Sequence, residues 1–248
     1  MRRAGFALFL LAALSGFAGG LRAQPLVVDL SSHLVAITTG FTGTEVVLFG
    51  AIEQPGNEIV VVVRGPEGPV TVRRKERLLG LWANGTSVTF TGVPAFYAVA
   101  ASRPLAEIAS RDQLARQRIG IDQLGFAPVG AVSDTARAIF HAALLREKQA
   151  AGLFPIVTGR VTFIGRQLFR SNVVFPPDVP TGAYQVSVYM FRNGQVVGAQ
   201  TTPLLISQTG VSADVQDFAY RRSLLYGLVA VLLAVMAGWL ASMIFRRS

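Results

Sequence analysis

The sequence predicts a mainly β protein: an immunoglobulin-like antiparallel sandwich with a helical insertion, a short second β unit and one C-terminal transmembrane helix. Three observations predict this class. Runs of β-branched and aromatic residues alternate with Gly- and Pro-containing turns over residues 24–103 and again over residues 153–208. Residues 104–152 instead place apolar side chains at helical spacing. Residues 223–245 form an uninterrupted uncharged run.

Residues 1–23 have the form of a secretory signal peptide. Arg2 and Arg3 provide a basic start, an apolar stretch follows, and Ala23 supplies a small residue before a polar segment. We expect cleavage after Ala23; the alternative is an uncleaved N-terminal membrane anchor. In both cases the residues that follow are exported, so the body of the protein is expected outside the cytoplasmic membrane.

The first β segment, residues 24–103, contains the clearest strand signals. Residues 59–63 are five consecutive β-favouring residues, which predicts a strand buried on both faces. In residues 87–91, Val88 and Phe90 alternate with polar residues and share one face. The Asn84–Gly85 pair just before them predicts a hairpin turn.

Residues 104–152 predict two helices. Residues 105–118 carry apolar residues among charged ones at amphipathic spacing. In residues 133–151 the signal is stronger, because Ser133 can cap the first turn and Gly152 can end the helix.

The second β unit, residues 153–208, contains the clearest hairpin signal of the chain. Residues 184–191 and 195–199 are β-favouring and are separated by Asn193–Gly194. A unit of this size rarely stands alone, so it is expected to pack on the two helices or to extend the first sheet. Residues 209–222 then form a polar juxtamembrane linker.

Residues 223–245 predict the transmembrane helix. The run has 23 residues between two arginine pairs, and a helix of this length spans roughly 34 Å, enough for the roughly 30 Å hydrocarbon core of a bilayer. The export signal orients the span, which leaves residues 246–248 as a cytoplasmic tail. Small residues recur at every fourth position and predict a packing face for another membrane helix. This face consists of Ala230, Ala234, Gly238 and Ser242.

Composition excludes several classes of function. The net charge of +9 suggests a nucleic-acid binder, but seven of the 23 basic residues lie in the signal peptide or flank the apolar run. The exported body is then near neutral, and we expect no nucleic-acid partner. The chain has no cysteine, which removes disulfides, thiolate metal sites and cysteine nucleophiles.

The densest charge in the body predicts a contact site for an anion or a partner. Arg73, Lys75 and Arg77 share one face if the segment is a strand, and Arg74 points away. Grouped guanidinium groups bind oxyanions, lipid head groups or carboxylates. The alternative is a solvated strand end, with Glu76 offsetting one charge.

His33 and His141 are the only histidines. We expect a structural or surface role for each; a metal site or a hydrolase site would need them beside carboxylates. No nucleophile elbow, Walker motif or dinucleotide motif occurs, so we expect no enzyme activity, no catalytic residue, no metal and no cofactor. The aromatic residues of the first β segment are expected in the core rather than in a recognition patch. They are Phe41, Phe49, Trp82, Phe96 and Tyr97.

The chain resembles the alphaproteobacterial putative transmembrane protein family, and the order of many short motifs carries the resemblance. These motifs are Gly40-Phe41-Thr42-Gly43, Phe49-Gly50, Arg64-Gly65-Pro66, Arg73-Arg74-Lys75, Gly80-Leu81-Trp82-Ala83-Asn84, Val93-Pro94-Ala95-Phe96-Tyr97, Leu168-Phe169-Arg170, Pro180-Thr181-Gly182-Ala183-Tyr184 and Phe191-Arg192-Asn193-Gly194. The resemblance implies a bacterial inner-membrane location with a single span. It also implies an accessory role beside permeases similar to sulfite exporters, and it transfers no catalytic residue.

We therefore expect a membrane-anchored periplasmic accessory or binding module, in contact with membrane lipid and with a membrane protein partner. Two alternatives remain open: a structural adaptor in envelope assembly, and a membrane-anchored hydrolase.

Overall fold

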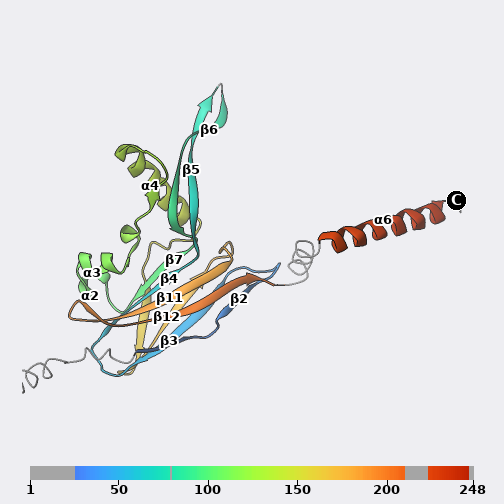
Figure 1. Cartoon of the computed structure of the whole chain (residues 1–248). Helices are drawn as coiled ribbons and strands as arrows, with labels where there is room; N and C mark the ends of the chain where they lie inside the picture. Colours follow the sequence, from blue (N-terminus) through green and yellow to red (C-terminus); the bar gives the residue numbers. More distant parts are fainter. Residues whose placement is uncertain (1–25, 79, 210–222, 246–248) are drawn as a thin grey trace, which may run out of the picture.

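The computed structural model describes residues 26–78, 80–209 and 223–245. The protein is mainly β, and most of its strands belong to one curled sheet (Figure 1). The strands of this sheet, in spatial order, are β1 (Leu26–Leu30), β3 (Thr44–Ile52), β10 (Leu168–Phe175), β9 (Gly159–Ile164), β7 (Tyr97–Ala101), β4 (Glu58–Arg64), β11 (Gly182–Arg192), β12 (Gln195–Gln208) and β2 (Leu34–Ile37). A second sheet contains β5 (Glu67–Leu78), β6 (Leu81–Pro94) and β8 (Ala127–Pro128).

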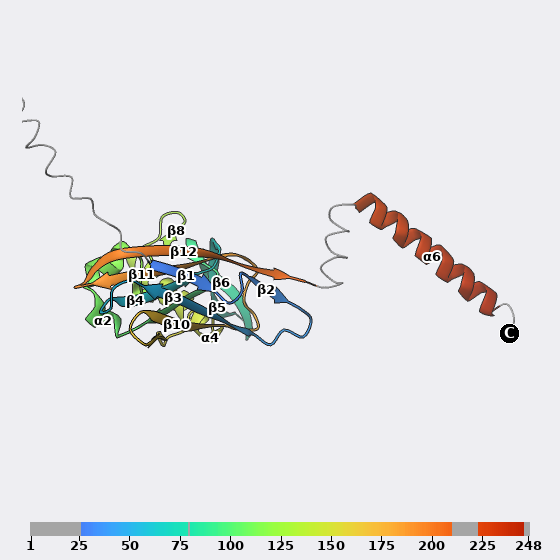
Figure 2. The ribbon, with the colours of Figure 1, turned by 90° about the horizontal axis from the view of Figure 1, so that it is seen from below.

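The nine-stranded sheet folds onto itself around one apolar core. Its two halves, β1-β3-β10-β9 and β7-β4-β11-β12-β2, join through a short parallel pairing of β7 with β9. Figure 2 views the body from below, with β12 and β10 along opposite sides. Side chains from both halves meet between them, among them Leu48, Val61 and Val188, which are fully buried. At the open side, the Gln200 side chain both accepts from Val28 N and donates to Val28 O, at 3.1 Å each, and so bonds β12 to β1.

Strand β4 is buried on both faces, as its run of apolar residues predicts. All five residues from Ile59 to Val63 are at most 1% exposed. Ile59, Val61 and Val63 face the core inside the curled sheet, whereas Val60 and Val62 belong to a second apolar cluster on its outer face. The prediction of two covered faces is confirmed, and β4 connects the two cores.

The second core is covered by the two segments inserted around β7. One is the β5–β6 hairpin, which contributes Val88 and Phe90. The other is the helical segment, which contains α2 (Leu105–Ile108), α3 (Arg111–Arg116), the short 3-10 helix η2 (Ile121–Gln123) and α4 (Asp134–Ala150). In Figure 1, α4 lies beside the hairpin, which projects from the sheet. The outer face of β4 is thus hidden by chain that is not part of the curled sheet.

The helix predictions are confirmed at α4 and corrected before it. The Ser133 side chain accepts a hydrogen bond from Ala136 N, and Gly152, at φ 68°, follows the helix end. The single helix predicted over residues 105–118 is instead two short helices. Ser110 has an extended backbone and its side chain accepts a hydrogen bond from Gln113 N. It therefore caps α3 and separates α3 from α2.

The turn predicted at Asn84–Gly85 is wrong. Both residues lie inside β6, and the chain reverses near Gly80, whose φ is +86°. A Cβ at Gly85 would approach only the flexible end of the Glu76 side chain on the paired strand. By contrast, the Asn193–Gly194 hairpin between β11 and β12 is confirmed, with φ values of 49° and 79° that fit a two-residue hairpin turn.

The second β unit extends the first sheet. β10 pairs with β3 over eight residue pairs, and β11 pairs with β4 over seven. Aromatic side chains from both units also meet in the core, with the Phe96 and Phe175 ring centroids 5.1 Å apart. Tyr184 packs against both rings and donates its hydroxyl to Pro180 O at 2.6 Å, and burial raises its pKa.

Residues 223–245 form helix α6 (Ser223–Phe245), which Figures 1 and 2 show apart from the β body. Its described side chains, at 226–228, 231–240 and 242, are all exposed. No helix within the described residues is both long and apolar enough to cross a membrane, so the predicted transmembrane helix is not confirmed. The predicted signal peptide and cytoplasmic tail, and all but the first residue of the linker, lie outside the described residues.

Gly50 in β3 is expected to be a sensitive position. A Cβ there would lie 2.5 Å from Phe169 Cζ and 2.6 Å from Val27 O, and the backbone oxygen cannot move aside. Gly50→Ala should therefore lower the free energy of unfolding by about 1–3 kcal/mol. Gly40→Ala is the matched control, because nothing lies within 4 Å of its Cβ position. Chemical denaturation of the two full-length variants in detergent measures the difference, and equal stabilities would contradict this packing.

Candidate functional site: a basic groove between β5 and α4

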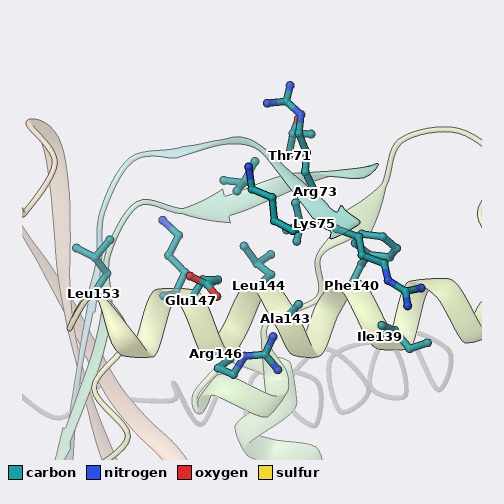
Figure 3. Close-up of a pocket in the computed structure, with 14 residues that line it drawn as sticks. Thr71, Arg73, Lys75, Ile139, Phe140, Ala143, Leu144, Arg146, Glu147 and Leu153 are labelled. Atoms are coloured by element: carbon teal, nitrogen blue, oxygen red, sulfur yellow. The ribbon is translucent and has the colours of Figure 1, made fainter. Parts of the chain in front are cut away.

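A groove with a volume of about 820 Å³ runs between β5 and α4 (Figure 3). Its floor is apolar, because Val70 and Val72 of β5 belong to the same cluster as Phe140 and Leu144 of α4. In Figure 3, Phe140 and Leu144 point from α4 toward the hairpin. The groove is thus formed by the β5–β6 hairpin and the helical segment, and not by the curled sheet. We call this site the basic groove.

Cations dominate the lining of the basic groove. Five basic side chains line it against one carboxylate, that of Glu147. The basic residues are Arg73, Arg74, Lys75, Arg146 and Lys148. The ion pairs within the described residues are made by His33, Arg103 and Arg137, so none neutralises this group. The groove therefore offers an excess of positive charge above an apolar floor.

Lys148 lines the groove and is partly desolvated. Its Nζ donates to Ala95 O at 3.2 Å and lies 5.7 Å from the centre of the Phe154 ring. Burial lowers the pKa of Lys148. An anion bound nearby would stabilise the charged form of Lys148 and raise its pKa again, so this side chain favours a negatively charged ligand.

The structure divides the residues predicted as an anion or partner site. Arg73 and Lys75 line the basic groove, whereas Arg77 is not among the lining residues and pairs with Trp82 near the hairpin end. Figure 3 shows Arg73 rising from β5 away from α4, so it borders the groove rather than filling it. Arg74, which the prediction set apart, is also a lining residue.

Arg146 and Lys148 were missed by the sequence prediction. Their signal is present as two cations in the last turns of a predicted helix. However, only the packing of α4 on the hairpin brings them to the cations of β5, and no spacing rule in the sequence predicts that contact.

A second polar network holds the helical segment to the sheet. The Tyr97 hydroxyl donates to Arg118 O at 3.0 Å and accepts from Gly120 N at 2.8 Å. Arg64 donates to Gln117 O and to Arg118 O, at 2.7 and 2.9 Å. Burial raises the pKa of Tyr97 to about 12, so the phenol stays neutral at ordinary pH and its role is structural.

The two histidines lie in separate environments. His33 Nε2 is 3.0 Å from Asp29 Oδ1, and both side chains are more than half exposed. The His141 ring lies beside the rings of Phe90 and Phe126, with distances between ring centroids of 6.2 and 5.3 Å. In the described parts of the chain, no group of three or more His, Asp or Glu residues is arranged to hold a metal ion.

The aromatic residues also divide. Phe96 and Tyr97 are fully buried, as predicted, whereas Phe49 and Trp82 are exposed. Of the predicted helix-packing face, Ala234, Gly238 and Ser242 are exposed on α6, and the side chain of Ala230 is outside the described residues.

Comparison with curated proteins and with solved structures gave no match. A family model described as "Putative transmembrane protein (Alph_Pro_TM)" matches residues 25–247, nearly the whole chain. The predicted resemblance is thus confirmed, and the chain belongs to this family.

Proposed function

We propose that this protein is a membrane-anchored accessory module of the bacterial inner membrane, with its β body in the periplasm and its C-terminal end in the cytoplasm. In this proposal α6 is a single membrane span, and the basic groove binds an acidic segment of a membrane protein partner. The single observation that carries the binding role is the groove itself, with its five cations, one carboxylate and apolar floor.

The strand order supports an immunoglobulin-like body. In that fold, strands A, B, E and D form one sheet and strands C, F and G the other, with an added C′ strand in variable-type domains. The order β1-β3-β10-β9 matches A-B-E-D, and β7-β4-β11-β12 matches C′-C-F-G. Tyr184, near the start of β11, bonds back to Pro180 O as the tyrosine of the E–F corner does. Such bodies commonly serve binding, and here the two insertions supply the site.

The exposure of α6 supports the membrane span. The helix has 23 residues and no charged residue. Its large described side chains, such as Leu228, Val231 and Val235, are all exposed and find no apolar partner in the β body. Lipid would remove this surface from water, and a helix satisfies its own backbone polar groups there. The description of the family also indicates a membrane location.

The chemistry of the groove favours an acidic segment of chain over a small free anion. A volume of about 820 Å³ lies in the usual range for sites that bury a large ligand, and a small oxyanion would leave most of it empty. Arginine side chains bind carboxylates with two parallel hydrogen bonds. Apolar side chains of the same segment could cover Phe140 and Leu144 on the floor.

A permease similar to sulfite exporters is the first partner to test, because the family resemblance implies it. The small residues Ala234, Gly238 and Ser242 would let a helix of that partner approach α6 closely. The periplasmic groove and the membrane helix would then contact the same partner.

Photo-crosslinking tests this proposal. A photoreactive residue at Ile139, which lines the groove and is 60% exposed, should capture a polytopic membrane protein in intact cells. The same probe at Val27 on β1, which is 64% exposed, is the position control. Reversing two groove charges, with Arg74→Glu and Arg146→Glu, should abolish the crosslink, because the introduced carboxylates would repel the acidic segment of the partner.

Arg166→Glu with Arg170→Glu is the charge-matched control, since both residues are exposed and lie outside the groove. The proposal fails if the Ile139 crosslink survives the groove reversal or captures lipid alone.

One observation favours a second candidate, an adaptor in envelope assembly. β5 is the edge strand of its sheet, so an extended segment of another exported protein could add to it. Capture of a soluble periplasmic protein at Ile139, with function retained by a body released from α6, would favour the adaptor over the accessory module.

A further inference from the structure

The end of the β5–β6 hairpin exposes two large apolar side chains. Leu81 is 75% exposed and Trp82 is 70% exposed, and Figure 1 shows the hairpin projecting beyond the rest of the body. Gly80 makes the reversal with φ +86°. An exposed Trp beside an exposed Leu on a projecting turn is unfavourable in water and marks a contact surface. We call Arg77, Gly80, Leu81 and Trp82 the hairpin tip.

The strand next to the tip is strongly basic. Arg73, Arg74, Lys75 and Arg77 lie in the second half of β5, and Glu76 is the one acid among them. Arg77 is directly opposite Trp82 in the strand register. Trp prefers the boundary between hydrocarbon and water, and cations beside it can bind anionic head groups. Arg77 is not among the lining residues of the basic groove, and its place beside Trp82 fits the surface of an anionic bilayer.

The chain is long enough for the tip to reach the membrane that holds α6. β12 ends at Gln208 and α6 begins at Ser223, so the connection can span at most about 50 Å. β5 has 12 residues, which corresponds to a hairpin roughly 40 Å long. The body can therefore stand beside the bilayer with the tip in contact with it.

We propose that the hairpin tip inserts Leu81 and Trp82 into the head-group region of an anionic bilayer, while Arg77 binds its phosphates. This inference rests on the proposed function in one respect, since it takes α6 as the anchor that brings the body to the membrane. Two contacts fix an orientation. The basic groove lies a few residues before the tip in β5. It would then open close to the membrane surface, where loops of a membrane protein emerge.

The two tryptophans of the chain allow a direct test. Trp82 is in the tip and Trp239 is in α6. In Trp239→Phe, Trp82 is the single reporter; in Trp82→Phe, Trp239 is. Each full-length variant is reconstituted in vesicles of phosphatidylglycerol and phosphatidylethanolamine, and separately in phosphatidylcholine alone. Tryptophan fluorescence is then measured with brominated lipids and with an aqueous quencher.

In anionic vesicles, Trp82 should be quenched by lipids brominated near the head group and protected from the aqueous quencher. In phosphatidylcholine vesicles Trp82 should be accessible to the aqueous quencher. Arg77→Gln, in the Trp239→Phe background, should weaken the insertion equilibrium roughly five-fold, the effect of one cation near an anionic surface. Arg166→Gln is the matched control and should change nothing, because it is exposed on the β9–β10 turn.

The inference is overturned if Trp82 stays accessible to the aqueous quencher in anionic vesicles. It is also overturned if Trp82 is protected without quenching by brominated lipids, because a protein contact would then cover the tip. Trp239 separates this failure from a failure of the anchor. Quenching of Trp239 alone by brominated lipids rejects the tip contact and keeps the span, whereas no quenching of either residue rejects both.

Discussion

Replacing Leu233 and Met236 with arginine is expected to release the protein from the membrane. Both side chains lie near the middle of α6 and are exposed. Each arginine at the centre of a membrane span costs roughly 2.5–3.5 kcal/mol on the insertion scale. The pair should therefore remove most of the preference for the bilayer, and the protein should pass into the soluble fraction after extraction of membranes with alkaline carbonate.

The control for this substitution keeps the apolar character of the helix. Leu233→Met with Met236→Leu conserves the two side-chain types, and the protein should stay in the carbonate-washed membranes. Thermal unfolding of the purified arginine variant verifies that the β body is intact, because none of the body's strands is altered. A span for α6 would be rejected if the arginine variant remained as resistant to carbonate as the unchanged protein.

Removing one phenylalanine from each core is expected to destabilise different parts of the body. Phe175 belongs to the core inside the curled sheet, whereas Phe90 belongs to the cluster under the hairpin and helices, and both are fully buried. Truncation of a buried Phe to Ala typically costs about 3–5 kcal/mol. Phe175→Ala should lower the stability of the whole body by this amount. Phe90→Ala should mainly loosen the hairpin and α4.

Hydrogen exchange followed by mass spectrometry measures this difference by region. In Phe90→Ala, protection should fall in β5, β6 and α4 and persist in β3, β10 and β11. In Phe175→Ala it should fall throughout. The two variants also serve as controls for each other, since they remove the same side chain at equal burial. Equal loss of protection in all regions would show that the two cores unfold as one unit.

Local patterns predicted the elements whose signal lies within a few residues. The run at residues 59–63 predicted a strand with two covered faces because five consecutive side chains must point alternately to both. Asn193–Gly194 predicted its turn because both residues tolerate positive φ. The same reasoning failed at Asn84–Gly85, which lies inside β6, whereas the chain reverses near Gly80. An Asn-Gly pair inside a strand and an Asn-Gly pair in a turn have the same sequence signature.

The candidate site was predicted only in part, for a similar reason. The cations Arg73 and Lys75 are neighbours along the chain and could be recognised together. Arg146 and Lys148 join them across the groove, from a helix some 70 residues away in the sequence. Likewise, the exposed Trp82 was expected in the core, because an aromatic residue in a strand pattern does not reveal that its strand extends beyond the sheet.

The sequence alone determined the periodicities of this protein: mainly β structure, a capped helix after Ser133, and an uncharged helical run of 23 residues near its C-terminal end. The tertiary structure decided which strands pair, because β10 with β3 and β11 with β4 are contacts over more than a hundred residues. It also decided that the insertions cover the outer face of β4 and form the basic groove. Periodicity reports which side of an element is apolar, whereas the partner of that side is selected by the packing of the whole chain.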